Sequence, residues 1–139
     1  GEFTLSHPDI RCPEQGKTYS VNHGNFFAYN EKVQKYIEDC QRKTKADGGP
    51  YSQRYTGSMV ADMHRNMLKG GIFLYPGTDV NPNGKLRLVY ECNPFAFILE
   101  VANGIATNGK DKILQIQPQS LHQRISFFAG SKSMMEAFA

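Results

Sequence analysis

The segment between Gly84 and Pro94 constrains the fold of this chain more than any other, because a charged strand pattern runs directly into a helix start. Side chains of an extended strand alternate between the two faces of a sheet. Over residues 86–91 this alternation predicts a strand with Lys85, Arg87 and Glu91 on one face and the larger apolar residues on the other.

A helix is predicted to follow at once, because Asn93 is a good N-cap and Pro94 suits the first helical position. Glu91 would then lie where the strand ends and the helix dipole begins. Two cations and one carboxylate at such a junction suit a phosphorylated ligand and a metal that bridges it. The alternative is a solvated sheet face on which Arg87 and Glu91 form a weak ion pair.

Apolar patterning elsewhere alternates between strand and helix periods, which favours the α/β class, with helices packed on a mixed sheet. The helix predicted from Pro94 to Ala102 is apolar nearly all round, so we expect it to be covered on most sides. Other predicted helices follow Asn30, Ser58 and Ser131, and the other predicted strands are residues 2–5, 18–21, 72–75 and 125–128.

Composition sets further limits. A chain of 139 residues is expected to form one domain. No apolar run is long enough to span a bilayer. The net charge is only +3 and the basic residues are scattered, so the sequence shows no basic patch of the kind that binds nucleic acid. The chain has three cysteines, which are widely spaced. This pattern predicts neither a disulfide framework nor a structural zinc site, and we expect a reducing compartment. Cys92 is interpreted as a small buried residue at the helix entry, with a nucleophile as the alternative.

Several segments resemble class I fructose-1,6-bisphosphatases. They are GKLRLVYECNP at 84–94, RYTGSMVADMHR at 54–65 and GGIFLYP at 70–76, followed by residues 114–118, 121–124 and 130–131 in the family's order. The resemblance covers residues 1–139 and implies the C-terminal, substrate-binding half of the sugar-phosphatase fold. The family's Asp-Pro-Leu/Ile-Asp-Gly-Ser metal motif does not occur in this sequence. The N-terminal half, with most metal ligands and the AMP site, is therefore expected to be absent.

The resemblance implies a cytoplasmic, homotetrameric hydrolase of gluconeogenesis. It would use Mg²⁺, Mn²⁺ or Zn²⁺ to hydrolyse the 1-phosphate of fructose 1,6-bisphosphate, giving fructose 6-phosphate. Its partners would be its own N-terminal domain and other copies of itself, with no nucleic acid and no membrane. One glutamate cannot hold the metals that this chemistry needs, so the chain alone is expected to be inactive. The alternatives are a sedoheptulose-1,7-bisphosphatase and a sugar-phosphate-binding module without catalysis.

The same resemblance assigns roles to individual residues. The sugar 6-phosphate would be bound by Asn22, Tyr55, Tyr75 and Lys85, whose amide, phenol and ammonium groups can all donate to phosphate oxygens. The remaining assignments are the backbone around Gly57, Ser58 and Met59 at the sugar hydroxyls, Arg54 in the site of a neighbouring subunit, Arg87 near the 1-phosphate and Glu91 as a metal ligand. This sequence departs from the family at Asn25, where many animal enzymes have a tyrosine that touches phosphate.

Overall fold

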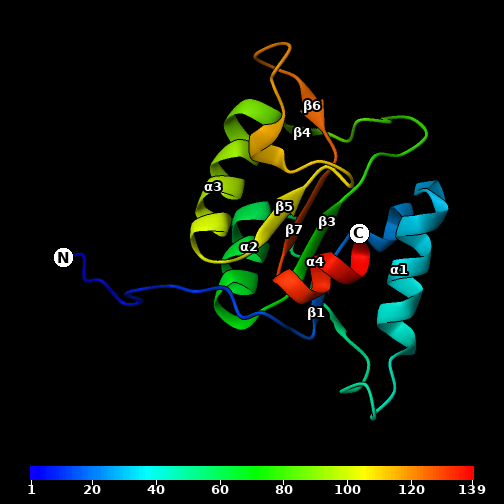
Figure 1. Ribbon diagram of the computed structural model, residues 1–139, viewed down its shortest axis with the longest axis horizontal. Coiled ribbons are helices and arrows are strands. Elements are labelled where there is room, and N and C mark those ends of the chain that lie inside the picture. The colour runs from blue at the N-terminus through cyan, green and yellow to red at the C-terminus, as the bar shows by residue number, and fades with distance from the viewer.

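A five-stranded mixed sheet forms the centre of the computed structural model, which describes residues 1–139 (Figure 1). Its strand order is β2-β1-β3-β7-β5. Strand β1 is parallel to β2 and β3, whereas β7 is antiparallel to both β3 and β5. The bounds are Thr18–Ser20 for β1, Ser52–Gln53 for β2, Ile72–Tyr75 for β3, Ile105–Thr107 for β5 and Phe127–Gly130 for β7.

Helices cover both faces of this sheet, so the predicted α/β class is confirmed (Figure 1). One face carries α2 and α3, and the other carries α1 and α4. None of these helices has the length and hydropathy needed to traverse a bilayer. The bounds are Glu31–Arg42 for α1, Met59–Lys69 for α2, Asn93–Val101 for α3 and Lys132–Phe138 for α4.

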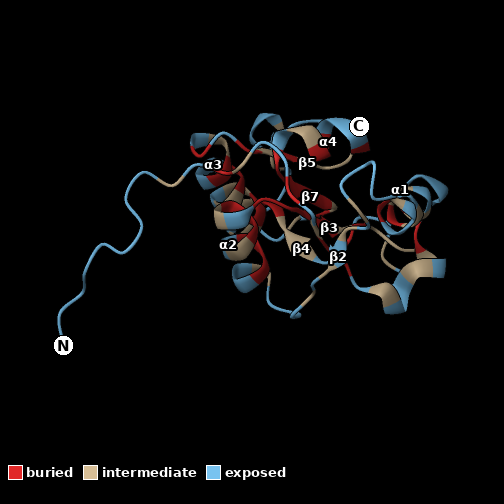
Figure 2. Ribbon diagram, turned by 90° about the horizontal axis from the view of Figure 1, so that it is seen from below, coloured by how far each residue is buried: buried red, intermediate tan, exposed pale blue.

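The alternation of side chains along β3 divides the interior into two cores. Phe73 packs into the core beneath α2 and α3, while Ile72 and Leu74 pack into the core beneath α1 and α4. All three are at most 1% exposed, as expected for a central strand covered on both faces. Figure 2 shows the buried residues gathered in the strands and on the helix faces turned toward them.

The predicted strand at residues 2–5 is wrong. Residues 1–5 are without secondary structure and exposed, and this segment extends away from the body of the protein (Figures 1 and 2). The large apolar side chains of Phe3 and Leu5 are 108% and 81% exposed. A strand needs a partner for its backbone groups, and no strand of residues 1–139 lies beside this segment.

The predicted strand over residues 86–91 is also wrong beyond Arg87. Strand β4 is only Leu86–Arg87 and pairs with β6, Arg124–Ile125. The chain then forms a π-helical turn, η2, over Leu88–Cys92, which continues into α3. Leu88 and Cys92 are both fully buried, so the core selects residues four apart rather than alternate ones.

The helix start differs in detail as a result. Cys92, not Asn93, is the N-cap residue of α3, and the backbone N–H of Asn93 donates to the Leu88 carbonyl within the π-helical turn. Pro94 was predicted at the first helical position and is the second residue of α3, still within its first turn. Because proline has no N–H, Pro94 donates no hydrogen bond back into the π-helical turn.

Helix α3 is covered on fewer sides than its composition predicts. Ala96 and Leu99 are fully buried toward the sheet. Phe97, Ile98 and Val101 are 62%, 49% and 62% exposed, because no other element of this chain packs over that side.

All three cysteines are free and buried, in agreement with the interpretation of Cys92 as a packed residue. Burial is the main cause that raises the pKa of Cys92 to about 12, and the neighbouring Glu91 raises it further. Burial likewise raises the pKa of Cys40 to about 11. Thiolate is the reactive form, so none of these thiols is set up as a nucleophile.

We therefore predict that a chromogenic disulfide reagent at about pH 8 leaves the native thiols unmodified, although free cysteine reacts readily there. All three thiols should react once the protein is unfolded in guanidinium chloride. A Ser120→Cys variant supplies the control, because Ser120 is exposed and its thiol should react at once. Rapid release of chromophore from the native parent chain would contradict the burial.

Gly130 at the end of β7 is predicted to tolerate no side chain. A Cβ there would overlap the carbonyl oxygen of Gly71 and lie 2.8 Å from the Cα of Ile72, both backbone atoms of the neighbouring chain segment. Gly130→Ala should lower the free energy of unfolding in urea by about 3 kcal/mol, because strands β3 and β7 must separate. Gly49→Ala is the comparison: its φ is +84° and no atom lies within 4 Å, so backbone strain alone should cost about 1 kcal/mol. A smaller loss of unfolding free energy for Gly130→Ala than for Gly49→Ala would contradict the close approach of Gly130 to the Gly71–Ile72 backbone.

Candidate functional site

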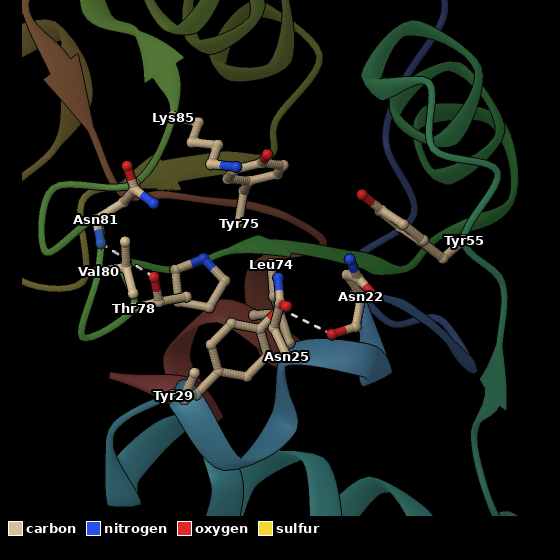
Figure 3. A pocket seen from close by; sticks show the side chains of 13 residues that line it. Asn22, Asn25, Tyr29, Tyr55, Leu74, Tyr75, Thr78, Val80, Asn81 and Lys85 are labelled. Carbon is tan, nitrogen blue, oxygen red and sulfur yellow. Dashed lines mark hydrogen bonds between the residues drawn. The ribbon is translucent and has the colours of Figure 1, made fainter.

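A cavity of about 280 Å³ opens beside the end of β3 and brings together four predicted site residues, Asn22, Tyr55, Tyr75 and Lys85 (Figure 3). Each comes from a different part of the chain: the turn after β1, the loop after β2, the end of β3 and the loop before β4. The other lining residues are Asn25, Ala28, Tyr29, Leu74, Pro76, Thr78, Val80, Asn81 and Gly84.

Local hydrogen bonds fix the Asn22 wall of this cavity. Asn22 is the N-cap of the 3₁₀ helix η1, His23–Ala28, and its side-chain oxygen accepts the N–H of Gly24 at 3.0 Å. An amide whose oxygen is occupied in this way presents its NH₂ group as the free donor. Figure 3 shows that end of the side chain turned into the cavity.

Tyr29 supports the same wall from behind. Its hydroxyl donates to the Asn22 carbonyl oxygen at 2.8 Å, and the side chain is buried. Burial is the main cause that raises the pKa of Tyr29 to about 12. Its proton is committed to the backbone, so Tyr29 shapes the cavity without offering a free donor.

Tyr55 and Tyr75 place two phenol groups on the cavity. In Figure 3 the hydroxyl end of Tyr55 points toward the side on which Tyr75 and Lys85 lie. Burial raises the pKa of Tyr55, and the neighbouring Tyr75 and Asp62 raise it further. The Tyr55 hydroxyl therefore keeps its proton at neutral pH and can donate a hydrogen bond.

The charge of the cavity is positive. Lys85 is its one charged lining residue, and no carboxylate lines it. Asn25, Thr78 and Asn81 also line the cavity. A space lined by amides, hydroxyls and one ammonium group suits an oxyanion, which accepts hydrogen bonds from all of them.

Arg87 and Glu91 lie outside this cavity but contact each other. One Glu91 carboxylate oxygen accepts the backbone N–H of Arg87 at 2.7 Å, across the start of the π-helical turn. The Arg87 guanidinium instead donates to the Tyr90 hydroxyl at 3.2 Å and to the Lys85 carbonyl oxygen at 3.1 Å. The alternative that the side chains of Arg87 and Glu91 form an ion pair on one strand face is therefore wrong.

The metal-binding chemistry of this chain is incomplete. No three side chains of the metal-ligating types His, Cys, Asp and Glu cluster anywhere in residues 1–139. Magnesium prefers octahedral coordination by oxygen, and Glu91 would supply a single carboxylate. The residues of this chain therefore do not form a complete divalent-metal site.

The remaining candidates do not line the cavity. Arg54 is exposed and donates through Nη1 to the carbonyl oxygen of Gln53 at 2.9 Å. Gly57 has a φ of +82°, which permits the turn before α2. Ser58 is the N-cap residue of α2 as predicted, but its side chain makes no capping bond, and Met59 packs partly against the core.

Sequence reasoning did not find Tyr29, Thr78 or Asn81. Tyr29 carries no local signal, since it simply precedes the helix cap Asn30. Thr78 and Asn81 lie in the polar turn of residues 78–84, where the Thr78 hydroxyl accepts the N–H of Asn81 at 3.2 Å. Such residues are expected in any turn, so only the folded structure reveals that they line a cavity.

Comparison with known families agrees with this geometry. Residues 12–139 match the family described as Fructose-1-6-bisphosphatase, C-terminal domain. The matched range includes the whole sheet, the cavity and both residues of the Arg87–Glu91 contact. This chain therefore belongs to the fructose-1-6-bisphosphatase C-terminal domain family.

Proposed function

We propose that this chain binds the sugar 6-phosphate in a fructose-1,6-bisphosphatase, which hydrolyses the 1-phosphate of fructose 1,6-bisphosphate in gluconeogenesis. The observation that carries the proposal is the convergence of Asn22, Tyr55, Tyr75 and Lys85 on one cavity. These four residues are separated in the sequence by up to sixty-three positions, from 22 to 85, so their meeting is a product of the fold.

The chemistry of the four side chains supports a phosphate ligand. A phosphate group has several acceptor oxygens and needs donors from several directions. An amide, two protonated phenols and an ammonium group supply donors of different reach. With Lys85 as the one charge, an anion gains an attractive partner and meets no repelling carboxylate.

The reacting end of the substrate is proposed to lie toward Arg87 and Glu91. Arg87 would contact the 1-phosphate, and Glu91 would be one ligand of a Mg²⁺, Mn²⁺ or Zn²⁺ site completed by an N-terminal domain. The backbone at Gly57, Ser58 and Met59 would contact the sugar hydroxyls. Arg54 would reach the site of another copy in a homotetramer. The chain alone would then show no turnover, because its own residues do not complete a metal site.

Lys85→Met is predicted to raise the Kd for fructose 6-phosphate of the full-length protein by about 10- to 100-fold, the usual cost of a hydrogen bond to a charged group. Isothermal titration calorimetry measures the change. Lys110→Met, at an exposed turn away from the cavity, should leave the Kd unchanged. Equal effects of the two substitutions would contradict the phosphate assignment. If the unmodified protein hydrolyses sedoheptulose 1,7-bisphosphate faster than fructose 1,6-bisphosphate, the substrate assignment changes to sedoheptulose 1,7-bisphosphate.

Glu91→Gln is predicted to weaken the apparent affinity for Mg²⁺, measured by phosphate release, by at least about tenfold. Mutation of residues that only hydrogen-bond to a metal ligand already lowers metal affinity by about tenfold or more, so loss of a ligand itself should lower it at least as much. The glutamine oxygen can still accept the N–H of Arg87, so the turn should survive. Fructose 6-phosphate binding should therefore persist in this variant. An unchanged magnesium dependence would remove Glu91 from the metal site.

A further inference from the structure

A buried ion pair on α2 lies directly behind the segment that carries Tyr55. The carboxylate of Asp62 is 2.9 Å from Nη1 of Arg65, one turn further along the helix. The Asp62 side chain is fully buried, and that of Arg65 is 24% exposed. Neither residue lines the cavity, so neither is a candidate for ligand contact.

This pair holds the two peptide groups that flank Tyr55. After Tyr55, the carboxylate of Asp62 accepts the backbone N–H of Thr56 at 3.0 Å and its hydroxyl at 3.2 Å. Before Tyr55, Nη2 of Arg65 donates to the carbonyl oxygen of Arg54 at 3.4 Å. The same guanidinium nitrogen donates to Ser20 in β1 at 2.8 Å, which connects the segment to the sheet.

Few other hydrogen bonds fix the backbone of this segment to the rest of the protein. It has no helix or strand assignment over residues 54–57, and Arg54, Thr56 and Gly57 are exposed. The backbone of Arg54 is held by the Tyr19 carbonyl oxygen at 3.0 Å, but beyond Thr56 the positive φ of Gly57 marks a turn. The Tyr55 ring packs against the core beneath α2 and α3, and the contacts that Thr56 makes with Asp62 fix the backbone from which the ring and its hydroxyl are presented.

Stability alone is a poor explanation for such a pair. Burying two charges costs free energy, and apolar residues of similar volume often stabilise a core as well or better. Here the Nε of Arg65 is buried without any partner, which adds to the cost. A contact that is costly yet directed at both sides of one side chain fits a role in orienting that side chain.

We propose that Asp62 and Arg65 are positioning residues that hold the Tyr55 hydroxyl in the geometry needed for phosphate binding. The ligand in this inference rests on the proposed function, whereas the orientation of Tyr55 is a property of the free protein. Two measurements separate these parts, one without ligand and one with fructose 6-phosphate.

The first measurement is ¹⁹F NMR of the full-length protein labelled with 3-fluorotyrosine, in which Tyr55→Phe identifies the Tyr55 resonance. We expect one narrow Tyr55 resonance in the unmodified protein and a broadened or split one in Asp62→Asn. Thr56→Val removes an exposed hydroxyl that contacts Asp62 and also accepts the N–H of Ser58 at 3.2 Å, so it tests the same contact if Asp62→Asn does not fold. Thr56→Ser keeps the hydroxyl and should restore the narrow line.

The second measurement is a double-mutant cycle on the Kd for fructose 6-phosphate. Asp62→Asn should raise the Kd by about tenfold, and Tyr55→Phe by a similar factor. If Asp62 acts through Tyr55, the double variant should lose little more affinity for fructose 6-phosphate than the Tyr55→Phe variant alone. Met63→Leu, a buried volume-conserving change on the same helix, should alter stability without altering the Kd.

The positioning role is overturned if the Tyr55 resonance stays narrow in Asp62→Asn and Thr56→Val. It is equally overturned if Asp62→Asn raises the Kd for fructose 6-phosphate by the same factor whether residue 55 is tyrosine or phenylalanine. A narrow Tyr55 resonance that fails to shift on adding fructose 6-phosphate would overturn the proposed ligand. In that case the effect of Asp62→Asn on the resonance still decides the positioning role.

Discussion

The structure depends above all on the burial of β3 on both of its faces. This strand pairs with β1 on one side and β7 on the other, and its successive side chains enter two different cores. Its last residue, Tyr75, packs against the edge of one core and also lines the cavity. The hydrophobic packing that orders the sheet thus also sets the position from which the cavity is built.

Strong local patterns were sufficient to predict much of this framework. The apolar run of β3 and the helical period of α1 were both predicted from sequence and are confirmed. The cap of α1 is confirmed in detail, because the side chain of Asn30 accepts the N–H of Val33 at 3.0 Å. The end of α2 at Gly70, with a φ of +79°, also matches its sequence signal.

Weak or ambiguous patterns account for the errors. Residues 86–91 fit a strand by alternation, but the burial of Leu88 with Cys92 is a helical spacing that only the core can select. Strand β5 was not predicted, because three residues carry too little pattern and its pairing with β7 is non-local. The meeting of Asn22, Tyr55, Tyr75 and Lys85 was anticipated from family resemblance, and periodicity alone would not have revealed it.

The four-sided construction of the cavity has a thermodynamic consequence. Its walls come from segments around Asn22, Tyr55, Tyr75 and Lys85 that are joined to one another mainly through the sheet behind them. A ligand that touches all four would act as a reversible cross-link between loops that otherwise open independently. Occupancy would then slow hydrogen exchange and proteolytic cleavage in these loops together, including the exposed turn at residues 79–80.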